Sequence, residues 1–172
     1  PAYVQEIGVG YNAEPDPLCY PGTSVLINRG NLPDQAELDE FEFALFQTRV
    51  DEPLPGGNLD YPHYRAIHHH LFQDVYDWAG QQRTIRIAKG GNWFCYPEHL
   101  DAHMSATFAW LAERDFLVAL DETAFAEQAA YFLGELNAGH PFREGNGRTQ
   151  LVFLKLLVSN AGRSFDDDAI DT

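Results

Sequence analysis

At 172 residues, with 45% hydrophobic and 13% aromatic residues, the chain has the size and composition of one globular domain and not of a disordered protein. Its 26 acidic and 11 cationic residues leave a formal net charge of −15. An acidic surface repels nucleic-acid phosphates and anionic lipids, which argues against a dedicated nucleic-acid or membrane-surface binder.

The two cysteines, Cys19 and Cys95, are far apart and lack the spacing of metal ligands, so we expect no disulfide framework and a reducing compartment. The first residues lack the pattern of a signal peptide, and no apolar run approaches the ~18 residues that a membrane span needs. These features predict a cytoplasmic protein, and secretion by a machine that reads other signals stays open.

The first half of the chain predicts an arm and two helices. Residues 1–33 are rich in Pro, Gly, Asn and Tyr and predict an extended arm laid over the domain, with a short helix near residues 24–29. Asp34 is the predicted N-cap of a helix that ends at about Val50. Apolar residues at helical spacing predict a second helix over residues 61–78.

Residues 83–96 change to the alternating pattern of strands, and the Lys-Gly-Gly-Asn sequence at residues 89–92 is typical of a tight turn. They predict a β-hairpin. Further helices are expected over residues 97–114 and 122–137, with a last one that ends near residue 162. The prediction is therefore a mostly α-helical domain with one hairpin inserted between helices.

We expect residues 34–163 to form this domain, preceded by the arm of residues 1–33. Residues 164–172 form a tail, in which Asp166, Asp167 and Asp168 are expected to be a solvated end.

The sequence His-Pro-Phe-Arg-Glu-Gly-Asn-Gly-Arg at residues 140–148 carries the clearest chemical signal, because a hydrophobic helix-forming segment follows it at once. The N-terminus of such a helix is suited to bind a phosphate. Two glycines permit a backbone anion nest, the amide between them can donate to a phosphate oxygen, and the arginine can bind phosphate with two parallel hydrogen bonds. These four residues are Gly145, Asn146, Gly147 and Arg148.

The same segment supplies a base and a metal ligand. His140 has an ordinary pKa near neutrality and is the natural general base, and Glu144 offers the hard oxygen that Mg²⁺ prefers. Phe142 is expected to be a core anchor. Each residue alone has an ordinary structural explanation, but a simple turn needs no combination of base, carboxylate, nest and arginine. The combination predicts transfer of a phosphate-containing group to a hydroxyl.

This segment resembles the signature of the Fic (filamentation induced by cAMP) family, and the resemblance covers about residues 17–163. Similar stretches are the helix before the hairpin, the hairpin itself and the N-terminal arm; they comprise Ile67-His68, residues 71–80, residues 87–90, Phe94-Cys95 and residues 20–22.

The resemblance implies an all-α Fic fold, a helical bundle with one β-hairpin flap, and a protein adenylyltransferase that moves AMP from ATP to a Tyr, Thr or Ser hydroxyl of a target protein. The site roles above are implied for its residues, with His140 catalytic and Mg²⁺ held by Glu144. In the flap, Ile87, Ala88 and Lys89 are expected to bind the target segment by strand-like pairing.

Two positions depart from the family pattern. Leu151 stands where a second arginine is usual, one helical turn after Arg148, so we expect weaker or differently oriented nucleotide binding. The alternatives are a different phosphate-containing donor or a catalytically impaired binding module. Gly139 replaces a larger apolar residue and is expected to loosen the helix end before His140.

Regulation is the last expectation. The family's inhibitory pattern, Ser/Thr-x-x-x-Glu-Gly/Asn, has no match: Glu52 is followed by Pro53 and Glu127 by Gln128. Because the short toxin-type members are held by a separate small antitoxin, the resemblance implies such a partner.

Two other features weigh less. Consecutive histidines at residues 68–70 point in different directions on a helix and are not expected to share a metal. Trp93 is expected to anchor the hairpin, although it flanks the flap and can reach a ligand.

Overall fold

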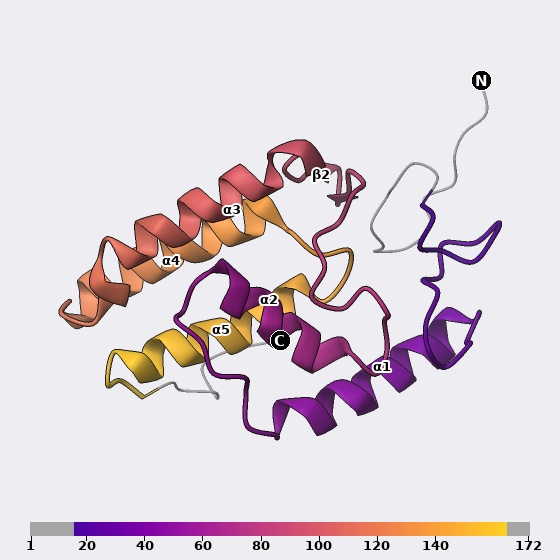
Figure 1. The fold of residues 1–172 in the computed structure, drawn as a ribbon, viewed down its shortest axis with the longest axis horizontal. Helices are drawn as coiled ribbons and strands as arrows, with labels where there is room; N and C mark the ends of the chain where they lie inside the picture. Colours follow the sequence, from indigo (N-terminus) through magenta and orange to yellow (C-terminus); the bar gives the residue numbers. More distant parts are fainter. Residues whose placement is uncertain (1–15, 165–172) are drawn as a thin grey trace.

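The computed structural model describes residues 16–164, so the first 15 residues of the predicted arm and the acidic end at residues 166–168 lie outside the described part. The structure is mostly helical with one two-stranded hairpin (Figure 1), which confirms the predicted fold class. In chain order the elements are α1 (Gln35–Val50), α2 (Tyr61–Phe72), β1 (Ala88–Lys89), β2 (Asn92–Trp93), α3 (Pro97–Ala112), the 3₁₀ turn η1 (Asp115–Leu117), α4 (Glu122–Gly139) and α5 (Asn146–Asn160).

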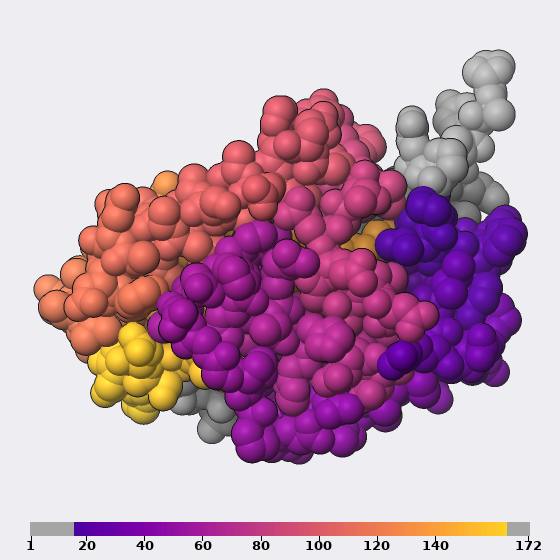
Figure 2. All heavy atoms as spheres, in the orientation of Figure 1, coloured from indigo at the N-terminus to yellow at the C-terminus, as the bar shows by residue number. Residues whose placement is uncertain are grey.

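The helices pack in pairs around α5. Helices α3 and α4 lie side by side as an antiparallel pair, α5 packs against α2 and α4, and α1 crosses the outer side of α2 (Figure 1). In the space-filling view (Figure 2), α1, α2, α3 and the flap make up most of one face, and α5 emerges only at one end. No described helix combines the length and apolar character needed to cross a bilayer.

Aromatic side chains fill the centre of the bundle. Tyr64 of α2 stacks on Phe142 with 5.5 Å between ring centroids and meets Phe153 of α5 edge-on at 5.4 Å. Phe108 of α3 and Phe132 of α4 complete the cluster. Phe142 is fully buried in it, so the prediction of a core anchor is confirmed. The segment at residues 140–148 is therefore anchored by one side chain in a cluster to which four helices contribute.

The helix ends follow local signals where side chains can cap them. Asp34 accepts hydrogen bonds from the N–H groups of Ala36 and Glu37, as the sequence predicts for an N-cap. The turn between β1 and β2 has Gly90 and Gly91 at φ of 57° and 79°, the backbone that a two-residue hairpin requires. Both predictions are confirmed, although the strands themselves are only two residues long.

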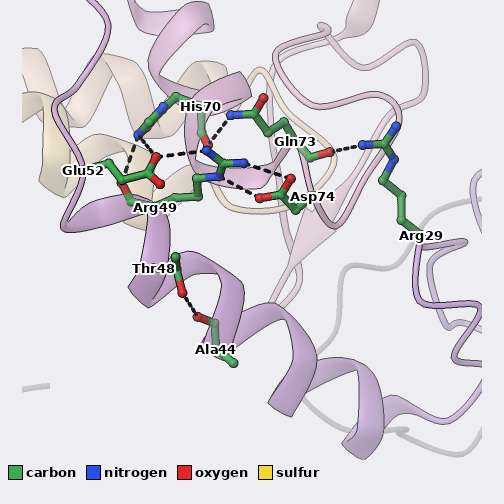
Figure 3. Close-up of polar contacts among 8 residues, drawn as sticks. All are labelled: Arg29, Ala44, Thr48, Arg49, Glu52, His70, Gln73 and Asp74. Atoms are coloured by element: carbon green, nitrogen blue, oxygen red, sulfur yellow. Dashed lines mark hydrogen bonds and ion pairs between the residues drawn. The ribbon is translucent and has the colours of Figure 1, made fainter.

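The end of α2 was predicted wrongly. The helix stops at Phe72 and not at Trp78, and residues 73–79 form turns. Figure 3 shows that arginines from other segments bind polar groups of this stretch. Arg49 of α1 binds the Asp74 carboxylate through two nitrogens at 2.6 and 3.0 Å, and Arg29 binds the Gln73 carbonyl at 2.7 Å.

The predicted short helix at residues 24–29 is also absent. Leu26 forms an isolated antiparallel bridge with Cys19, and the Asn28 side chain bonds the backbone of Leu26 and Leu32. These bonds hold the segment extended, because a side chain and a neighbouring strand-like segment satisfy its backbone in place of a helix.

Candidate active site

The loop between α4 and α5 brings the predicted chemistry to one place. His140 ends α4 in the left-handed region at φ 49°, a conformation that is uncommon outside glycine. Gly145 precedes α5 at φ 77°, and a Cβ there would lie 2.5 Å from the Phe72 ring. Glycine is thus required at residue 145 both by backbone angle and by space. At Gly147 a Cβ would meet nothing within 4 Å.

Two buried polar side chains hold this loop from inside. The Asn146 amide accepts from the Phe142 N–H at 2.9 Å and donates to the Phe142 carbonyl at 2.8 Å. His68 accepts from the Gly80 N–H at 2.8 Å, so its other nitrogen is the donor to the Glu144 carbonyl at 3.0 Å. Burial lowers the pKa of His68 to about 3, which keeps it in this neutral form.

These bonds assign Asn146 a structural task. Its side-chain amide is engaged within the loop, so the group it presents to a phosphate is the backbone N–H at the start of α5. The first intrahelical bond of α5 is made by the Thr149 N–H to the Gly145 carbonyl at 3.0 Å. The N–H groups of residues 146–148 therefore precede the helical ladder, which is the usual arrangement at an anion-binding helix end.

His140 is a buried imidazole held flat against the flap. Its ring stacks on Phe94 with 3.8 Å between centroids and 12° between planes. Burial and, to a smaller extent, the charges of Arg83 and Lys89 lower the pKa of His140 to about 4, against the opposite effect of a hydrogen bond to the Asn137 carbonyl. The imidazole is therefore neutral at pH 7, as a general base must be.

Arg83 joins the flap to the loop, and sequence reasoning missed it. Its buried guanidinium donates to the carbonyls of His140 at 2.7 Å and Gly139 at 3.1 Å on the loop side. On the flap side it donates to the carbonyls of Ile85 and Cys95, both at 2.6 Å. The Cys95 N–H adds a bond to the carbonyl of residue 138 at 3.0 Å. A lone arginine at the start of a predicted strand carries no local signal of this role.

The predicted target-binding residues of the flap differ in exposure. The side chains of Ile87 and Ala88 are buried, whereas that of Lys89 is exposed. The Ile87 carbonyl accepts from the Phe94 N–H at 3.1 Å within the hairpin. An incoming segment would therefore meet the exposed Lys89 and the backbone of this strand rather than the side chains of Ile87 and Ala88.

Arg148 lies in the first turn of α5 with acidic groups on two sides. It forms an ion pair with Glu42 of α1, and its Nη2 lies 3.8 Å from the Glu144 Oε1. Its guanidinium also stands over the Phe72 ring, 4.7 Å from the centroid. Tyr76 donates to the other oxygen of Glu42. Glu42 therefore orients Arg148, a contact between residues 106 positions apart that the sequence pattern does not reveal.

Glu144 has the chemistry of a single-carboxylate magnesium ligand. Its Oε1 accepts from the Gly145 N–H at 2.9 Å, and burial raises the pKa of this carboxyl, although the Gly145 bond and Arg148 act against the rise. Within residues 16–164 no cluster of three or more metal-ligating side chains is present. One carboxylate suffices for Mg²⁺ when substrate phosphates and water supply the remaining oxygens, so the residue fits the metal.

The two departures from the family pattern have different consequences in the structure. Leu151 is half-buried one turn after Arg148 and brings no donor to this end of α5. Gly139 packs closely on α3: a Cβ there would lie 2.7 Å from the Met104 sulfur and 2.9 Å from the His103 ring. The expectation of a loosened helix end is therefore wrong, because the missing side chain lets α3 and α4 approach each other at the base of the loop.

The three consecutive histidines separate as predicted. His68 reaches the loop, His69 bonds the carbonyl of residue 79 at 3.0 Å, and His70 bonds the Arg49 carbonyl at 2.9 Å. They share no metal geometry.

Known proteins share both the sequence pattern and the fold of this chain. The sequence model of the Fic/DOC family matches residues 58–158. The chain is 58% identical over 164 residues to "Probable protein adenylyltransferase y4lH" of Sinorhizobium fredii, which covers 95% of this chain and 85% of that protein. It is 37% identical to "Protein adenylyltransferase VbhT" of Bartonella schoenbuchensis over 94% of this chain, but spans only 34% of that protein.

The fold is also similar to that of a solved structure. The crystal structure of BepC, a VirB-translocated effector of Bartonella tribocorum, with bound AMPPNP, has a TM-score of 0.80 and 27% sequence identity. The match covers 90% of this chain and 82% of that one.

Proposed function

The chain belongs to the Fic/DOC family, and we propose that it is a protein adenylyltransferase that transfers AMP from ATP to a Tyr, Thr or Ser hydroxyl of a target protein. The observation that carries the proposal is the neutral, buried imidazole of His140 beside the N-terminus of α5. A base and a phosphate-binding helix end within one loop are the two parts that such a transfer needs.

In the proposed reaction the triphosphate lies on the backbone N–H groups of Gly145, Asn146 and Gly147, with Arg148 binding its oxygens. The imidazole of His140 accepts the proton of the target hydroxyl. The hydroxyl oxygen then forms a bond to the α-phosphorus while the bond to the β-phosphate oxygen breaks, and pyrophosphate leaves. Mg²⁺ held by Glu144 would neutralise phosphate charge when bound. Arg148 has to share its ion pair with Glu42 when the phosphates arrive.

The target segment is proposed to lie along the flap at Ile87, Ala88 and Lys89, by backbone pairing with the edge of β1. A separate small antitoxin that inhibits the enzyme is also part of the proposal. It is supported by the family resemblance and by the absence from the sequence of the inhibitory Ser/Thr-x-x-x-Glu-Gly/Asn pattern.

The test is incubation of the protein with a cell lysate and ATP labelled at the α-phosphate. We expect label on a protein band and a loss of about 10²–10⁴-fold in the initial rate for His140→Ala, the range typical of a positioned general base. His99→Ala, at an exposed histidine of α3, is the matched control and should retain the rate. Label from CDP-choline or another nucleotide, but not from ATP, would assign a different donor. If no donor labels any protein, the alternative of a catalytically impaired binding module, which Leu151 motivates, would replace the proposed function.

A further inference from the structure

The flap is a cationic segment on an acidic protein. Residues 78–97 contain three of the chain's 11 cationic residues and none of its 26 acidic residues. The rest of the chain therefore carries all the negative charge. At physiological ionic strength, charges interact over only about 8 Å, so a ligand at the flap responds to the local cations more than to the net charge.

Within this segment Arg86 is held between two aromatic rings. Its guanidinium carbon lies 3.8 Å from the centroid of Tyr96 and 4.4 Å from that of Trp93. Both rings are on the surface, with 46% and 53% of their area exposed. Two rings fix the plane of the guanidinium before any ligand binds, which lowers the entropy cost of recognising a carboxylate.

The guanidinium of Arg86 has no anionic partner among residues 16–164. No carboxylate of this part of the chain forms an ion pair with it, and its Nε is buried without a hydrogen-bond partner. The other arginine of the flap base, Arg83, is satisfied by four carbonyls; burial, with a smaller contribution from the charge of Arg86, lowers the pKa of Arg83 to about 10. Two arginines close together, one of them unpaired, form a site that a negative charge would stabilise.

We propose that Arg86, clamped by Trp93 and Tyr96, binds a carboxylate side chain of the target protein, so that the modified hydroxyl lies in an extended acidic segment. The inference rests on the proposed function, because it places that segment along the flap. Backbone pairing at β1 does not distinguish the side chains of the target segment, whereas the Arg86 clamp favours a negatively charged one. Exposed Lys89, whose charge acts on His140, adds to the same preference close to the base.

The test compares two fluorescent peptides that share an extended tyrosine-containing sequence and differ only in glutamate or glutamine beside the tyrosine. Their affinity for the full chain is measured by fluorescence anisotropy at physiological ionic strength. We expect the glutamate peptide to bind about tenfold more tightly, the gain from one charge-assisted pair. The net charge of −15 works against this result, so a preference for glutamate must come from a local site.

Variants locate the site. Arg86→Gln should abolish the preference, and Arg86→Lys, which keeps the charge, should retain part of it. The matched control is Arg114→Gln, since Arg114 also stacks on a tryptophan, 4.1 Å from the Trp110 centroid, but on the far end of α3. Equal affinity for the two peptides, or an equal loss in both glutamine variants, would overturn the inference.

The same peptides separate this inference from the proposed function. With labelled ATP, transfer to both peptides at equal rates without a binding preference would contradict the acidic target and leave the adenylyltransferase intact. A preference for glutamate in binding, abolished by Arg86→Gln but without transfer to any hydroxyl, would support the carboxylate site and count against the enzyme.

Discussion

The loop at residues 140–148 and the flap at residues 83–96 face each other across His140, but they are held in different ways. The loop is fixed from inside the core by Phe142 and by buried hydrogen bonds of His68 and Asn146. The flap is held at its base by Arg83, while its two-residue strands extend beyond that anchor. The difference matches the two proposed tasks, because a base and a phosphate site would have to be preorganised, whereas a surface that receives a target protein would have to stay accessible.

Removing the arginine at the flap base should have the largest effect on this arrangement. Arg83→Gln deletes side-chain bonds to four carbonyls, and we expect a loss of about 3 kcal/mol in the free energy of unfolding and a large loss of AMP transfer. Denaturant unfolding measures the change in free energy, and hydrogen exchange at the Phe94 and Cys95 amides measures opening of the flap. Exchange should rise at these amides and not in α1. Arg65→Gln removes one bond, to the Gly80 carbonyl, and is the control; an equal loss there would contradict a special role of Arg83.

The loop can be broken by a single methyl group. Gly145→Ala places a Cβ 2.5 Å from the Phe72 ring at a positive φ, and we expect a loss of about 1–3 kcal/mol in unfolding free energy. Gly147→Ala is the matched control two residues away, in open space within α5, and should change stability by less than about 1 kcal/mol. Urea denaturation of both variants checks the contrast. Similar stabilities of the two alanine variants would show that the loop rearranges to accommodate the added methyl group.

Acid should lower the free energy of unfolding through the two buried histidines that belong to or support the loop, His140 and His68. The pKa of His140 is about 4 and that of His68 about 3 in the folded protein, against an ordinary value of 6.5. Between pH 6.5 and 4 the unfolded chain therefore binds more protons than the folded chain, so the unfolding free energy falls as the pH falls. At pH 5 we expect a loss on the order of 1–2 kcal/mol from each histidine relative to pH 7.5.

Denaturant titrations at these two pH values measure this dependence. His140→Gln should reduce the pH dependence, because it removes one of the two histidines whose pKa is lowered in the folded protein. A wild-type stability that does not vary over this range would contradict the buried neutral state of both rings.

The smallest expected effect concerns the phosphate end of the loop. Leu151→Arg adds a donor one turn after Arg148, and we expect ATP affinity to rise by about five- to tenfold, the gain from one charge-assisted bond at a partly exposed position. Isothermal titration with ATP measures it. Leu151→Gln controls for loss of the apolar side chain and should not strengthen binding. An unchanged affinity in the arginine variant would mean that Leu151 does not limit nucleotide binding.

Local structure and the chemical motif can be predicted from the sequence because the residues that determine them are neighbours along the chain. The cap at Asp34, the Gly90-Gly91 turn and the left-handed glycine at residue 145 each involve backbone groups within four residues. The motif at residues 140–148 likewise places its base, carboxylate and helix end by adjacency. These features predicted the fold class and the position of the site.

Only the tertiary structure decided which side chains support that chemistry. Arg83 reaches across 57 positions to His140, and Glu42 across 106 positions to Arg148. The early end of α2 depends on Arg49, 25 positions from Asp74. No periodicity encodes such pairs, since they form only after the helices pack and exclude water around a charge. The sequence by itself thus determined the fold class and the family and predicted the reaction groups, whereas packing between distant segments determined what holds these groups in place.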